Sequence, residues 1–156
     1  MPPDVAETEA IARARERLEL SDRTPARAFL VSRRDPPQGA YYLVVLGDPS
    51  AALGIAAVDA ASGEVTQWAT LPDAATHPLL DREAAIQRTG ASSARRAELV
   101  WRSSPASRSP LYPIWEIDTG DMVVYIDHAG RVWPSLEPDA REIGRASCRE
   151  RVSYHV

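Results

Sequence analysis

The sequence predicts an α+β protein made of two tandem halves, each a helix followed by an antiparallel sheet. The chain has 156 residues, enough for one ordinary domain or two small ones. It is 44% hydrophobic and 26% charged, which is typical of a globular protein. A helical pattern followed by short strand patterns occurs twice, at residues 1–71 and 79–142, with a linker at 72–78. These patterns leave open whether the halves share one core.

The first half begins with a predicted helix over residues 5–20. Apolar residues recur there at spacings of three and four up to Leu18, which places them on one face of a helix. Asp4 together with Glu7 offers an N-terminal cap. We therefore expect a capped helix with one apolar side.

Four extended runs follow this helix, bounded by turn-forming residues. The run at Tyr41–Leu46 is apolar throughout, so both of its faces should be covered and it should lie at the centre of the sheet. Residues 51–61 are rich in alanine and could be helical by propensity, but Val58, Asp59 and the turn at Gly63 favour a strand. The predicted strands are Ala28–Arg33, Tyr41–Leu46, Gly54–Ala60 and Glu64–Thr70.

The second half repeats this order. Leu80–Thr89 is predicted to be a short helix, with Asp81 as its N-cap and Gly90 in the left-handed conformation after its last turn. Strand patterns and a hairpin turn at Thr119-Gly120 follow. The predicted strands are Ala97–Arg102, Leu111–Asp118, Asp121–Asp127 and Arg131–Trp133.

Each half closes with an aspartate placed before a glycine turn. The first half reads Val-Asp-Ala-Ala-Ser-Gly, with Asp59 and Gly63, and the second reads Ile-Asp-His-Ala-Gly, with Asp127 and Gly130. A carboxylate at this position can accept hydrogen bonds from the backbone N–H groups that follow it. We interpret these four as structural turn residues and the two segments as parts of a degenerate internal repeat. The alternatives are chance similarity between two hairpins and a paired acid site formed by the two aspartates.

The hairpin from Tyr41–Val45 to Val58–Val65 resembles the PepSY family, whose members carry a Val-Asp, a short turn to Gly, then an acidic or polar residue and Val. Residues Tyr112–Val132 match the same pattern more loosely. The resemblance implies a PepSY-like or cystatin-like fold in which a helix packs on an antiparallel sheet. It also implies a pro-region or accessory module of metallopeptidases, or a domain of cell-envelope proteins, that binds or inhibits rather than catalyses. The zinc peptidase pattern His-Glu-x-x-His is absent, so a peptidase would be a partner only.

We therefore predict a noncatalytic module that binds or inhibits a protein or peptide. Trp101, Trp115 and Tyr125 are the candidate contact residues, because aromatic side chains at strand spacing can line a concave sheet face. The alternative for such a stripe is the hydrophobic core. A rival hypothesis is a small enzyme with a cystatin-like cone whose pocket uses Asp127 and His128. A purely structural protein is the third.

Other classes of site lack their sequence signals. No glycine-rich phosphate loop or dinucleotide motif occurs, so no cofactor is expected. Asp118, Asp121 and His128 lie near one another, but their spacing matches no known metal site, so no metal is expected. The pairs Arg33-Arg34 and Arg95-Arg96 are interpreted as solvated strand or loop ends, with an anionic partner as the alternative. The sequence does not define the oligomeric state.

Near the end of the chain, residues 143–152 match the codon-by-codon translation of a common sequencing adapter. We predict that residues 143–156 are not native. Removing their three Arg and one Glu changes the net charge from −4 to −6 and removes Cys148, the single cysteine. So acidic a chain argues against nonspecific binding to nucleic acid.

Composition and hydropathy also bear on source and compartment. The chain has no Lys and no Asn, which predicts a high-GC bacterial gene. The apolar stretch Ala51–Val58 is much shorter than the ~20 residues that span a bilayer, and the first 20 residues have no apolar signal segment. The chain as encoded is therefore expected in the cytoplasm, or outside it if the N-terminus is incomplete.

Overall fold

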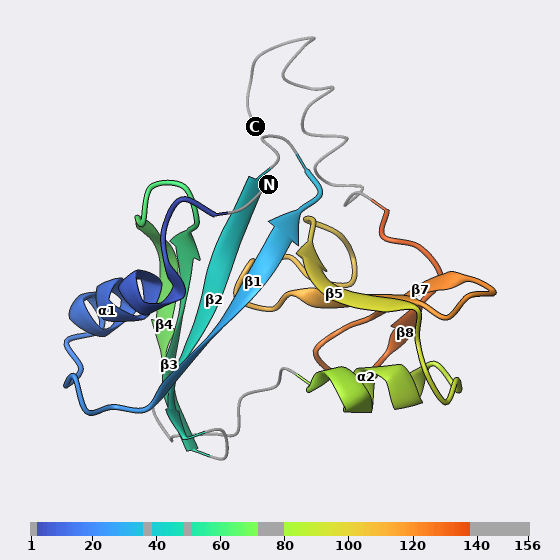
Figure 1. Cartoon of the computed structure of the whole chain (residues 1–156), viewed down its shortest axis with the longest axis horizontal. Coiled ribbons are helices and arrows are strands. Elements are labelled where there is room, and N and C mark those ends of the chain that lie inside the picture. The colour runs from blue at the N-terminus through green and yellow to red at the C-terminus, as the bar shows by residue number, and fades with distance from the viewer. Residues whose placement is uncertain (1–2, 36–38, 49–50, 72–79, 138–156) are drawn as a thin grey trace, which may run out of the picture.

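A computed structural model shows residues 3–35, 39–48, 51–71 and 80–137 as two helices and one eight-stranded mixed sheet (Figure 1). This confirms the predicted α+β class. The elements are α1 (Glu7–Arg17), β1 (Ala26–Arg33), β2 (Gly39–Asp48), β3 (Ala51–Asp59), β4 (Val65–Thr70), α2 (Arg82–Arg88), β5 (Arg96–Trp101), β6 (Ile114–Asp118), β7 (Val123–Ile126) and β8 (Val132–Trp133). The predicted linker at 72–78 and tail at 143–156 lie outside the described residues. Neither described helix is long and apolar enough to cross a membrane.

The strands lie in the order β4-β3-β2-β1-β5-β6-β7-β8. All neighbours are antiparallel except β1 and β5, which run parallel with Ser32 opposite Val100 and Arg33 opposite Trp101. Each half therefore contributes a helix and a four-stranded antiparallel meander, and the two meanders meet at their first strands. Figure 1 shows α1 beside the first meander and α2 beside the second.

Successive side chains of β2 point to opposite sides of the sheet and pack in two different hydrophobic clusters. Tyr42, Val44 and Leu46 face one side of the sheet, where they pack with Ala10 and Ala14 of α1. The intervening residues of β2 face a larger cluster on the other side. All residues of Tyr41–Leu46 are buried, which confirms the predicted central strand. We call the two sides of the sheet the α1 side and the core side.

The larger cluster draws on both halves of the chain. Leu43 and Ile55 come from the first half, Ile117 and Ile126 come from the second, and Ile86 comes from α2. The two halves thus share one hydrophobic core, and the two helices pack on opposite sides of the sheet.

The helix ends agree with the predictions in one case and differ in the other. Asp81 caps α2 by accepting a 2.7 Å hydrogen bond from the Ala84 N–H, and Gly90 has φ +84°, as expected. The predicted Asp4 cap of the first helix is wrong, because its N-cap residue is Ala6 and makes no side-chain capping bond. The Val5 N–H instead donates to the Ala60 carbonyl, which ties the segment before the helix to the chain just after β3.

The sixth strand is shorter than predicted. Residues 111–113 were expected in it, but it begins at Ile114. The Tyr112 N–H donates to the Ser109 carbonyl, and the Tyr112 carbonyl accepts from the Ser107 hydroxyl. These bonds hold Tyr112 in a compact loop, and Pro113 has no N–H to give to a neighbouring strand.

Candidate binding surface

The two turn aspartates use their carboxylates on the chain that follows them. Asp59 Oδ2 accepts hydrogen bonds from the Ala61 and Ser62 N–H groups at 3.1 and 2.8 Å. Asp127 Oδ1 accepts from the backbone N–H groups of residues 129 and 131, both at 2.9 Å. Gly63 and Gly130 have φ +79° and +83°, a region that favours glycine.

Asp127 makes one bond that has no counterpart at Asp59. Its Oδ2 accepts a 2.9 Å hydrogen bond from Trp133 Nε1. The Arg131 guanidinium lies 4.8 Å from the centre of the same indole ring. Asp127 is buried, so this carboxylate both holds the turn and orients an aromatic side chain at the end of the sheet.

His128, the other residue of the enzyme hypothesis, lies against Tyr112 with ring centroids 4.8 Å apart. Its Nδ1 is buried and has no hydrogen-bond partner. No hydrogen bond joins it to Asp127 within the described part of the chain. Among the same residues, no cluster of three or more His, Cys, Asp or Glu could hold a metal ion.

Two of the three candidate contact residues lie in the core. Trp101 and Trp115 are only 6% and 9% exposed and belong to the shared cluster. Trp101 Nε1 donates to the Ser107 hydroxyl at 3.3 Å, and Trp115 Nε1 donates to the Leu80 carbonyl at 2.9 Å. The prediction that Trp101 and Trp115 form a contact face is therefore wrong. Both side chains point to the core side, where they pack in the shared cluster.

Tyr125, the third candidate, points to the α1 side of the sheet. The strand register places Glu98 of β5, Glu116 of β6, Tyr125 of β7 and Trp133 of β8 in one row, each directly opposite the next. Neither described helix covers this row, because α1 packs on the first half and the buried residues of α2 belong to the core side. We call this surface the open face; its residues are Arg34, Arg96, Glu98, Glu116, Tyr125 and Trp133.

On the open face, two arginines bridge two glutamates. Glu98 and Glu116 are direct cross-strand neighbours, an arrangement that is unfavourable for like charges. Arg34 Nη2 donates to both carboxylates, at 2.9 Å to Glu98 and 3.0 Å to Glu116. Arg96 lies 3.4 Å from Glu116 and 3.9 Å from Glu98. Arg34 and Arg96 lie at strand ends with exposed side chains, as predicted, and both also take part in this network.

Glu116 is the least exposed charged group of the network, with 11% of its side chain exposed against 38% for Glu98. Burial raises the pKa of Tyr125, and Glu116, which accepts a hydrogen bond from the phenol, raises it further. The network thus combines a fixed carboxylate, two half-exposed guanidinium groups and a protonated phenol. Sequence reasoning missed Glu116, because its partners become visible only when the strands are in register.

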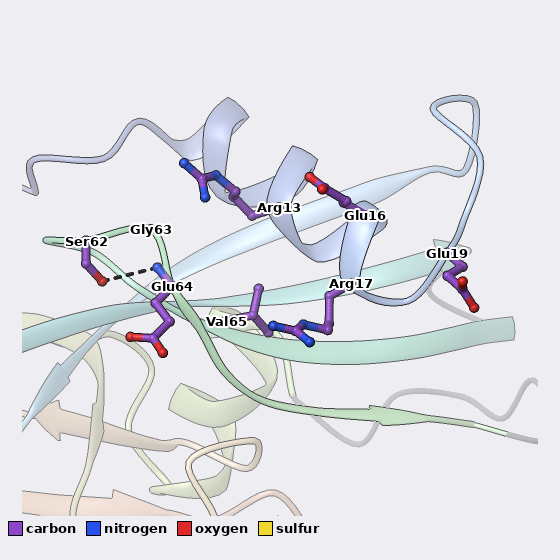
Figure 2. A pocket seen from close by; sticks show the side chains of 8 residues that line it. All are labelled: Arg13, Glu16, Arg17, Glu19, Ser62, Gly63, Glu64 and Val65. Atoms are coloured by element: carbon purple, nitrogen blue, oxygen red, sulfur yellow. Dashed lines mark hydrogen bonds between the residues drawn. The ribbon is translucent and has the colours of Figure 1, made fainter.

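A second surface lies between α1 and the turn that joins β3 to β4 (Figure 2). This groove has a volume of about 530 Å³. Its lining residues are Arg13, Glu16, Arg17, Glu19, Ser62, Gly63, Glu64 and Val65. Beyond the groove, the Arg17 guanidinium lies 4.7 Å from the ring centre of Trp68, which is 48% exposed. Charges of both signs line the groove, so its electrostatics select no single class of charged ligand.

Comparison with known proteins adds little to this geometry. No protein-family model matches the chain, and no curated protein matches it. Among solved structures, the chain is similar to a "putative lipoprotein" from Clostridium difficile 630, with 14% sequence identity and a TM-score of 0.34. The match covers 88% of this chain and 95% of that one. A TM-score of this size does not establish a shared fold, so no property of that protein is transferred to this chain.

Proposed function

We propose that the protein is a noncatalytic binding module and that its open face docks a segment of a partner protein. One observation carries this proposal. The row of Glu98, Glu116, Tyr125 and Trp133 crosses four strands on the side of the sheet that neither described helix covers. The other side of the same strands is filled by the shared core.

The chemistry of the open face suits a protein segment. Tyr, Trp and Arg are the residue types most enriched among side chains that dominate interface energies. Here the aromatic pair Tyr125 and Trp133 lies beside a charged group of Arg34, Arg96 and Glu98. A matching partner presents an apolar side chain to the aromatic end and polar or charged groups to the other end.

The row is also held in place before any partner arrives. Asp127 fixes the indole of Trp133, and two arginines fix Glu116. A surface that is already ordered loses less side-chain entropy on binding, which favours affinity. The resemblance of the first hairpin to the PepSY family supports the same class of function, since it implies an interaction module.

The enzyme hypothesis has weaker support. A general base needs a lone pair within hydrogen-bond reach of the substrate proton that it removes. Both Asp127 oxygens already accept hydrogen bonds, from two backbone N–H groups and the Trp133 indole. We therefore favour a structural role for Asp127 and retain binding as the proposed function.

The proposal can be tested without knowing the natural partner. Peptides that bind the wild-type chain are selected from a random phage-displayed library, and their Kd values are measured for wild type and variants. Truncating an interface hot spot costs at least about 1–2 kcal/mol, so Tyr125→Ala and Trp133→Ala should each weaken binding about tenfold or more. Leu53→Ala, at a residue 41% exposed in the first half, is the matched control and should leave Kd unchanged. A library without binders, or binders indifferent to both aromatic variants, would contradict the proposal.

A further inference from the structure

The two edges of the sheet differ in how well they are protected. Edge strands expose unpaired backbone groups, and proteins commonly block them with charges, proline or short length. β8 has only two residues and lies between Arg131 and Pro134. β4 has six residues, Val-Thr-Gln-Trp-Ala-Thr, with neither a charge nor a proline. Only the edge at β4 thus has the length and chemistry of a pairing site.

The outer side of β4 is accessible. β3 pairs with its inner side, and no strand of the described chain pairs with its outer side. Thr66, Gln67 and Trp68 in its middle are all exposed. Trp68 lies on the α1 side, since it is opposite Ala56 of the α1 cluster. Arg17 packs on its ring, so a large apolar surface is held beside the open edge.

We infer that β4 pairs antiparallel with β4 of a second copy of this chain, so that one sheet continues through both molecules. A two-fold axis perpendicular to the sheet places a strand against itself, so any charge on it comes close to the same charge of the other copy. The neutral sequence of β4 avoids this repulsion. Strand addition also satisfies the outward backbone groups by hydrogen bonding.

The register follows from symmetry and from the exposed indole. In an antiparallel pair with such an axis, one residue lies opposite its own copy. Placing Trp68 there brings the two half-exposed indoles together, a favourable cross-strand aromatic pair. Gln67 of one copy then lies diagonal to Gln67 of the other, within reach for long side chains.

The charges of the α1 groove fit the same arrangement. The helix runs in the direction of β4, because Val5 and Arg13 lie near Gly63 whereas Leu18 lies near Gly54, the partner of Thr70. Arg13 and Glu64 thus mark the start of the groove, and Arg17 and Glu19 mark its end. An antiparallel second copy brings start and end together, which sets Arg13 toward Glu19, while Arg17, which packs on Trp68, lies near the two-fold axis. This inference is independent of the role proposed for the open face.

Sedimentation equilibrium of the full chain tests the inference. Wild type should be a dimer at about 1 mM and dissociate on dilution. Gln67→Lys and Gln67→Glu should each weaken the dimer about tenfold or more by like-charge repulsion, and an equimolar mixture of the two should restore it. Val132→Lys, which adds a charge to the other edge at a residue 46% exposed, is the matched control. A wild-type protein that stays monomeric at about 1 mM, or a dimer insensitive to charge at Gln67, would overturn the inference.

Hydrogen exchange provides a readout that needs no variant. Amides of β4 that point outward should exchange more slowly above the dimer Kd than below it, because the second copy accepts or shields them. Amides of β8 should show no such dependence. A dimer in which protection grows at β8 and not at β4 would overturn the inference even if the substitutions destabilised the fold.

Discussion

On the α1 side of the sheet, the first half is apolar and covered by a helix, whereas the second half is aromatic and charged and carries the open face. Tyr42 and Val44 pack under α1, while Glu116 and Tyr125 occupy the corresponding side of the second meander. Both halves have the same order of elements, yet their helices pack on opposite sides of the sheet. The chemistry of each strand face therefore follows from where the helix packs, and neither described helix covers the side of the second half opposite α2.

The largest difference between the halves should be in how much the free energy of unfolding falls when an apolar side chain on the α1 side is truncated. Leu46 is fully buried under α1, so Leu46→Ala should lower the free energy of unfolding by about 2–5 kcal/mol. Val123→Ala changes a 40% exposed residue on the same side of the second half, and it should cost less than about 0.5 kcal/mol. Urea denaturation measures both values. Similar losses for the two variants would mean that the open face is covered.

The turn acids provide the next largest difference. Asp127 accepts three hydrogen bonds and is buried, whereas Asp59 accepts two from exposed backbone. Asp127→Ala should cost about 1–3 kcal/mol and Asp59→Ala about 0.5–1.5 kcal/mol. Because Trp133 loses its partner, tryptophan fluorescence should change in the first variant only. Equal costs and unchanged fluorescence would show that Asp127 does not position Trp133.

The glutamates of the open face should differ by a smaller amount. Glu116→Gln removes the charge that Arg34 and Arg96 both contact, and we expect a loss of about 1 kcal/mol that shrinks in high salt. Glu98→Gln acts on a more exposed group, so its effect should be below about 0.5 kcal/mol. Thermal unfolding at low and high salt compares the two. A larger effect at Glu98 would contradict the network as described.

The smallest expected effect concerns the ionisation of two tyrosines, one on each side of the sheet. Burial raises the pKa of Tyr41, whose hydroxyl donates to the Pro110 carbonyl on the core side, and it also raises that of Tyr125. A raised folded pKa means that the folded chain retains the proton. This contribution to stability is fully present below the unfolded value of about 10 and is lost as pH rises through the folded pKa. Tyr125→Phe should therefore reduce the alkaline loss of stability, measured by urea denaturation between about pH 9 and 11. An unchanged loss would show that Tyr125 titrates as a free phenol.

Sequence patterns predicted the local features of the fold. The apolar run at Tyr41–Leu46 predicted a strand buried on both faces, and Asp81 predicted the cap of α2. Trp101 lies two residues after Leu99 in β5, so both side chains face the same side of the sheet, which is the core side. The alternation alone could not tell which side a helix would cover, so Trp101 and Trp115 were assigned to a contact face.

The ion-pair network of the open face could not be predicted from the sequence, because its residues come from distant parts of the chain. Arg34 follows the first strand and Glu116 lies in the sixth, and they meet only because β1 and β5 pair in parallel. That pairing joins two meanders and has no local sequence signal. The internal repeat inferred from the two aspartate turns, and the resemblance to the PepSY family, remain predictions.

The most direct test of the account maps where a selected peptide binds. Backbone amide chemical shifts are recorded for the isotopically labelled chain as the peptide is added. The account predicts shifts concentrated in β5–β8, around Glu98, Glu116, Tyr125 and Trp133, with the α1 groove unchanged. Shifts confined to α1 and the β3–β4 turn would contradict it, and would move the binding site to the first half.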